Sequence, residues 1–123
     1  SELPEGRNDL EVLLQLGSAL NGSKHYADGR KVFERALVLP SFQSANAETR
    51  AMILYNLGCS ESGLSEKEPG LATQALEHLK LAVATARGTR INLKDYAAED
   101  GDLAPIRSNP EFQKLFGLKK GPR

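Results

Sequence analysis

The sequence has no tryptophan, and cysteine and methionine occur once each in its 123 residues. Its single cysteine, Cys59, cannot close an internal disulfide, which favours a reducing compartment. Acidic and basic residues balance at 16 each, so no overall field attracts nucleic acid or anionic lipid. No apolar run is long enough to cross a membrane. These absences predict a soluble intracellular protein that neither spans a membrane nor binds nucleic acid.

The composition that remains is ordinary for a globular protein, with 40% hydrophobic and 26% charged residues. A chain of this length has room for one domain with a modest core. We expect that domain at 8–117, between a flexible N-terminus at 1–7 and a flexible basic tail at 118–123.

Large and small residues recur at fixed offsets along the chain. Gly17 would let a second helix pack closely against the first, and Phe33 would fill the space between the two. The offsets are those of the tetratricopeptide (TPR) pattern, a pair of antiparallel helices, although Gly29 stands where alanine is usual. The pattern predicts a first repeat at 10–40, with a generic helical hairpin as the alternative. The first set is Leu13, Leu16, Gly17, Leu20, Gly29, Phe33 and Ala36.

A second copy follows at 45–87 and contains insertions. Between Gly58 and Ala75 there are five more residues than between Gly17 and Gly29. Insertions in such repeats fall in loops and helix ends, so the packing positions are kept. We expect Pro69 in the first turn of the fourth helix, after a capping group, and Gly88 at its end. The second set is Leu54, Leu57, Gly58, Ala75, Leu79 and Ala82.

A third, partial unit at 90–117 keeps the same phase and then departs from it. Pro105 and Pro110 forbid one long helix here. We expect a short helical turn at 103–107 and a final helix at 110–116, which together cover the open apolar end of the stack. The side chains expected to provide this cover are Leu103, Ile106, Phe112, Leu115 and Phe116. The predicted fold is all-α, a short superhelix of two helix pairs with C-terminal capping helices.

Taken together, the repeated offsets resemble a tetratricopeptide-repeat domain from about residue 8 to 116. The ending "DGDLAPIRSNPEF" is similar to the closing segment of many short domains of this family. With "AMILYNLGCSESGL", it looks like the terminal repeat module of chloroplast PDZ–tetratricopeptide photosystem II assembly factors. That resemblance implies a protein-binding scaffold or assembly factor in the chloroplast stroma, peripheral to a photosynthetic membrane complex.

The family resemblance also implies where a partner binds, because its first helices line a concave groove that holds a peptide. Carried over by position, the candidate partner-binding residues are Glu11, Leu14, Gln15, Ser18, Tyr55, Asn56, Cys59 and Lys94, with Asn21, Met52, Ser62 and Asp95 beside them. Asn56 matches one position of the family's clamp for a C-terminal carboxylate. The other clamp positions hold Leu14, Ser18, Ile91 and Asp95, so chaperone tails are not the expected ligand. We expect instead a peptide that carries one apolar anchor side chain.

Enzyme chemistry is not indicated. His25 and His78 are far apart in sequence, and neither has partners at metal-ligand spacing. We expect Cys59 to be a small structural thiol, and the acidic pairs Glu66–Glu68 and Glu99–Asp100 to be solvated charge. No catalytic residue, metal or cofactor is expected.

Two functions stay open at this point. The first is an adaptor or scaffold that binds another protein or a peptide segment. The second is a docking or regulatory module of a larger enzyme or RNA-associated complex, to which the basic residues Arg87, Arg90 and Lys94 could contribute an edge contact. The salt dependence of partner affinity distinguishes the two functions, because nucleic-acid binding weakens steeply as the salt concentration rises.

Overall fold

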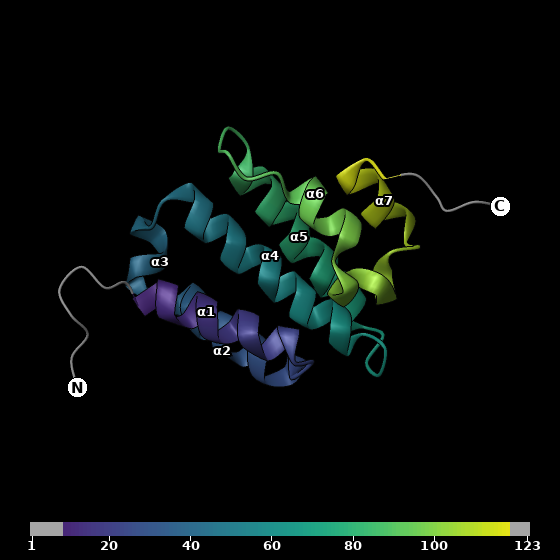
Figure 1. The fold of residues 1–123 in the computed structure, drawn as a ribbon, viewed down its shortest axis with the longest axis horizontal. Coiled ribbons are helices and arrows are strands. Elements are labelled where there is room, and N and C mark those ends of the chain that lie inside the picture. Colours follow the sequence, from purple (N-terminus) through teal and green to yellow (C-terminus); the bar gives the residue numbers. More distant parts are fainter. Residues whose placement is uncertain (1–8, 119–123) are drawn as a thin grey trace.

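The computed structural model describes residues 9–118, and this part of the chain is all-α, as expected. Four long helices form two antiparallel pairs, and short helices lie between and after them (Figure 1). The long helices are α1 (Asp9–Gly22), α2 (Tyr26–Val38), α4 (Ala47–Leu64) and α5 (Leu71–Ala86). The short ones are α3 (Pro40–Ser44), α6 (Leu93–Glu99), the 3₁₀ helix η1 (Gly101–Ile106) and α7 (Pro110–Phe116). The terminal segments predicted to be flexible fall outside the described residues, except for Leu118.

Helices α1 and α2 pack closely because Gly17 has no side chain. A Cβ atom at Gly17 would lie 2.4 Å from Cζ of Phe33, whose ring is fully buried. Ala36 is also fully buried. The predicted roles of Gly17 and Phe33 in the first pair are confirmed.

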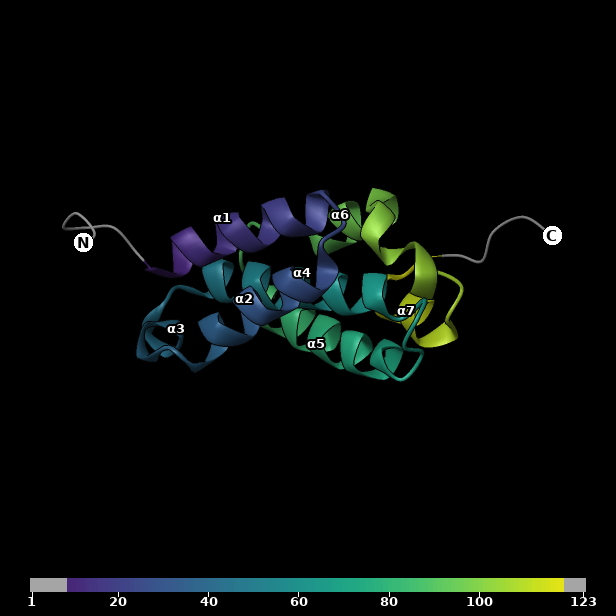
Figure 2. The same ribbon diagram turned by 90° about the horizontal axis from the view of Figure 1, so that it is seen from below.

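The same arrangement recurs in the second pair. A Cβ atom at Gly58 would lie 2.7 Å from Cγ of Leu79, which is fully buried like Ala82. Helix α4 is the centre of the fold and contacts α1, α2, α5 and η1. Figure 2 shows α1 and α6 on one side of α4 and α5 on the other.

The connection between the two pairs is more ordered than the sequence indicated. Pro40 follows the end of α2 and begins α3, at the position where its missing N–H costs nothing. Phe42 of α3 is buried in the core. The side chain of Asn46 then caps α4 by accepting a hydrogen bond from the Thr49 amide at 2.8 Å. The connection between the two pairs is therefore a short helix anchored by one aromatic ring.

The start of α5 differs from the prediction. Pro69 lies before the helix, which begins at Leu71 with no capping side chain at Gly70. Two turn hydrogen bonds, from the amides of Leu71 and Ala72 to the carbonyls of Glu68 and Pro69, lead into the helix instead. Pro69 therefore shapes the approach to α5 but is not part of its first turn.

The C-terminal segment covers the end of the stack. The expected turn and final helix are found as η1 and α7, and Gly117 ends α7 in a left-handed conformation with φ of 66°. The rings of Phe112 and Phe116 lie 5.0 Å apart between centroids. Leu103 and Ile106 are buried with them, and Leu115 is half-buried. Among the described helices, none is both long and apolar enough to cross a membrane.

Candidate functional site

One shallow pocket lies between α4 and α6, and four of the residues assigned to the groove line it. They are Met52, Tyr55, Asn56 and Asp95. Tyr96, Glu99 and Asp100 complete the lining of a cavity of about 370 Å³. We call these seven residues the acidic pocket, because they include three carboxylates and no basic side chain.

Helix α6 supplies the accessible chemistry of the acidic pocket. Asp95 and Glu99 are four residues apart and thus on one face of the helix. Both are exposed, and neither side chain has a hydrogen-bond or ion-pair partner among the described residues. Tyr96 is 50% exposed, and its ring centroid lies 6.2 Å from that of Tyr55. Two free carboxylates beside an open aromatic ring suit a cationic side chain.

Tyr55 contributes less surface than predicted. Its side chain is only 2% exposed, and its hydroxyl donates a hydrogen bond of 2.8 Å to Oδ2 of Asp100. Burial, followed by the nearby charges of Cys59 and Asp100, raises the pKa of Tyr55 far above its ordinary value. Tyr55 lines the acidic pocket but leaves little of its surface open to a partner, so its place among the partner-binding candidates stays a prediction.

Cys59 is fully buried and cannot contact a partner, which corrects its place among the partner-binding candidates. Its Sγ lies 3.5 Å from Oδ2 of Asp100. Burial raises the pKa of the thiol well above its ordinary value, and the charges of Asp100 and Asp102 act in the same direction. The expectation of a structural thiol agrees with this environment.

Cys59, Asp100 and Asp102 bring potential metal-ligand atoms within 4.8 Å of one another. Hydrogen bonds within the chain already use this group, however. Asp100 accepts from Tyr55, Cys59 and the amide of Asp102, and Asp102 accepts from the hydroxyl of Tyr26 at 2.7 Å. A thiol with a raised pKa is a poor metal ligand. The group joins η1 to α2 and α4.

Asn21 and Ser62 were also expected to face the groove, yet both are buried. The Asn21 amide donates to the backbone oxygen of Asn56 at 3.0 Å, and its oxygen accepts from Ser60 at 2.7 Å. A Cβ atom at Gly29 would lie 2.5 Å from that oxygen. This contact explains why glycine replaces the alanine of the repeat pattern.

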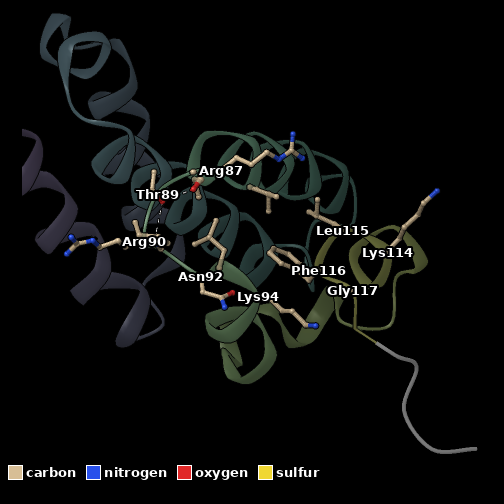
Figure 3. A pocket seen from close by; sticks show the side chains of 14 residues that line it. Arg87, Thr89, Arg90, Asn92, Lys94, Lys114, Leu115, Phe116 and Gly117 are labelled. Atoms are coloured by element: carbon tan, nitrogen blue, oxygen red, sulfur yellow. Dashed lines mark hydrogen bonds between the residues drawn. The ribbon is translucent and has the colours of Figure 1, made fainter.

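The candidates on α1 do not join the acidic pocket. Glu11 and Gln15 are exposed, whereas Leu14 and Ser18 are half-buried. Lys94 lies apart from both the acidic pocket and the candidates on α1. It lines a second cavity together with Arg87, Arg90 and Lys114 (Figure 3). The residues assigned to one groove are thus divided among several places, and of the described ones only Met52, Tyr55, Asn56 and Asp95 share the acidic pocket.

An ion cluster around the buried residue Glu61 was not predicted from the sequence. Glu61 is fully buried, with Oε1 2.7 Å from Nδ1 of His78 and Oε2 3.4 Å from Nε of Arg30. The Arg30 contact is an ion pair without hydrogen-bond geometry. Glu61 stands seven residues after Leu54, where the repeat pattern asks for a large residue, as Leu20 follows Leu13. A charged residue at a position that usually holds a large residue could have indicated the buried ion pairs.

No protein-family model, curated protein or solved structure matches the chain significantly. The resemblance to tetratricopeptide repeats therefore rests on the sequence offsets alone.

Proposed function

We propose that the chain is a non-catalytic protein-binding module whose partner segment lies across the acidic pocket. The observation that carries this proposal is the meeting of Met52, Asn56 and Asp95, assigned to a binding groove from sequence position, in one cavity beside the exposed ring of Tyr96. Exposed aromatic rings next to polar groups are favoured positions for partner contacts.

The pocket also indicates the chemistry of the partner. Asp95 and Glu99 can pair with a Lys or Arg side chain, and Tyr96 can cover the same cation with its ring face. Met52 is half-buried at the other wall and supplies an adaptable apolar contact. We therefore propose a peptide segment that carries a basic side chain next to an apolar one. The sequence predicted a peptide with an apolar anchor, and the pocket adds a basic side chain to that prediction.

An adaptor, scaffold or assembly factor is the role that such a module would serve. If the narrower resemblance of the closing segment holds, the partner is a component of a photosynthetic membrane complex and the compartment is the chloroplast stroma. We propose this partner and this compartment from the sequence resemblance, and neither depends on the chemistry of the acidic pocket.

A titration by fluorescence anisotropy tests the pocket. The probe is a short labelled peptide with one Arg flanked by Leu and Ser, compared with the same peptide bearing Gln in place of Arg. We expect Tyr96→Ala, and separately Asp95→Asn with Glu99→Gln, to raise the Kd of the Arg peptide about tenfold.

The matched control is Glu66→Gln with Glu68→Gln, which removes the same charge from exposed residues of the α4–α5 connection. It should leave the Kd unchanged. Equal affinity for the Arg and Gln peptides, or equal effects of both charge variants, would contradict the proposal.

A further inference from the structure

A second and larger cavity, of about 730 Å³, lies on another side of α6. The end of α5, the connection at 87–92, the start of α6 and the end of α7 form it. We call it the basic cleft. Its lining residues are Val83, Ala86, Arg87, Gly88, Thr89, Arg90, Ile91, Asn92, Leu93, Lys94, Lys114, Leu115, Phe116 and Gly117.

Among the described residues, four cations surround the basic cleft and no acidic residue lines it. Figure 3 shows Arg87 and Lys94 on opposite sides of Phe116, with Arg90 and Lys114 farther out. All four are exposed. None of their side chains forms an ion pair with another described residue, whereas the exposed Lys80 pairs with Glu111. The chain as a whole is neutral, so these four cations form a local excess of positive charge. One carboxylate lies close by, because Glu48 accepts a hydrogen bond from the backbone amide of Arg90 at 3.4 Å.

Between the cations the cleft is apolar. Val83, Ile91 and Leu115 are half-buried, and Phe116 forms part of the core beneath them. Their accessible parts give the cleft an apolar surface within the ring of positive charge. A ligand that fits both features carries carboxylates and apolar side chains together.

The connection that carries two of the cations is held in place by local hydrogen bonds. The Thr89 hydroxyl donates to the carbonyl oxygen of Ala86 at 2.6 Å and accepts from the amide of Ile91 at 3.1 Å. Gly88 supplies the left-handed turn with φ of 83°. Since this backbone is already ordered, little conformational entropy is lost when a partner binds to it.

We propose that the basic cleft binds an acidic peptide segment that also carries apolar side chains. The charge and the apolar floor favour a peptide over nucleic acid, because backbone binding of nucleic acid needs a positive surface that extends along the polyanion. Here the residue after Lys94 is Asp95, a carboxylate of the acidic pocket, so the positive charge does not continue along α6. The inference is independent of the function proposed for that pocket.

The test uses a labelled peptide of alternating Glu and Leu, with a Gln–Leu peptide, a single-stranded oligonucleotide and vesicles containing anionic lipid as comparisons. We expect the Glu–Leu peptide to bind and the other three to bind at least tenfold more weakly. The variant Arg87→Gln with Lys94→Gln should raise the Kd of the Glu–Leu peptide about tenfold, since two charge-assisted contacts are lost.

The control Lys31→Gln with Arg35→Gln removes the same charge from exposed, unpaired residues of α2. It should leave the Kd unchanged, and so should Tyr96→Ala in the acidic pocket. The helical circular dichroism of every variant should match the parent, because the substituted side chains are exposed. Tighter binding of the oligonucleotide or the vesicles, equal binding of the Gln–Leu peptide, or equal effects of both charge variants would overturn the proposal.

Discussion

The hydroxyl of Tyr55 on α4 donates a hydrogen bond to Asp100, 45 residues further along the chain, at 2.8 Å. Asp100 also caps η1 by accepting from the amide of Asp102 at 3.0 Å. Arg107 then donates to the backbone oxygens of Ala97 and Asp100. The Asp-x-Asp-Leu and Arg of the closing segment therefore tie the C-terminal cap to the central helix.

Removal of the Tyr55 hydroxyl should destabilise the fold. Tyr55→Phe keeps the ring but takes a hydrogen-bond donor from a partly buried carboxylate, so we expect a loss of about 1–3 kcal/mol in the free energy of unfolding. Tyr96→Phe is the matched control, since Tyr96 is half exposed and its hydroxyl has no hydrogen bond to another described residue. Urea unfolding measures both. Equal stability of the two variants would contradict a structural role for the Tyr55–Asp100 bond.

Close packing at Gly17 predicts a cost for a single added methyl group. Gly17→Ala would place Cβ against the buried ring of Phe33, and overpacking of this kind costs about 1–3 kcal/mol. Gly22→Ala provides the control, because a Cβ built at this residue of the same helix meets no described atom within 4 Å beyond its chain neighbours and the helix's own backbone. Thermal unfolding should show a lower midpoint for Gly17→Ala alone. A midpoint that stays at the parent value would show that α1 and α2 are farther apart.

Alkaline pH should unfold the protein. Burial raises the pKa of the Cys59 thiol and the Tyr55 hydroxyl above their ordinary values of 9.0 and 10.0. Above those values the unfolded chain releases protons that the folded chain keeps, so the free energy of unfolding falls as pH rises. Urea titrations at pH 7 to 11 should show this decline beginning at about pH 9. Cys59→Ala should reduce the slope between pH 9 and 10, and a flat profile in the parent would contradict the burial of these groups.

The sequence predicted the packing inside each helix pair better than the packing between them. Gly17 with Phe33, and Gly58 with Leu79, follow from local offsets, because helix geometry fixes which side chains meet across a hairpin. The burial of Tyr55 and Cys59 depends on Asp100, which reaches α4 only after the chain has turned back. Helical periodicity identifies a face but not the segment that covers it.

The same limit explains the ion cluster and the division of the groove. Glu61 needs Arg30 from α2 and His78 from α5, two contacts that no pattern within α4 reveals. Lys94 and Asp95 are neighbours in sequence, yet they line different cavities because successive helical residues point about 100° apart. Only the arrangement of α6 against α4 and α7 separates a positive cleft from a negative pocket.

We propose that partners bind at the acidic pocket. NMR chemical-shift mapping identifies the residues that a bound peptide contacts and so locates the binding site. Titration of the isotope-labelled protein with the Arg-containing peptide should shift the backbone amide signals of Met52, Asn56, Asp95 and Tyr96. Signals from the exposed residues Lys31 on α2 and Glu77 on α5 should stay in place. Shifts confined to α2 and α5, with the four pocket signals unchanged, would contradict the account and place the partner on the opposite face.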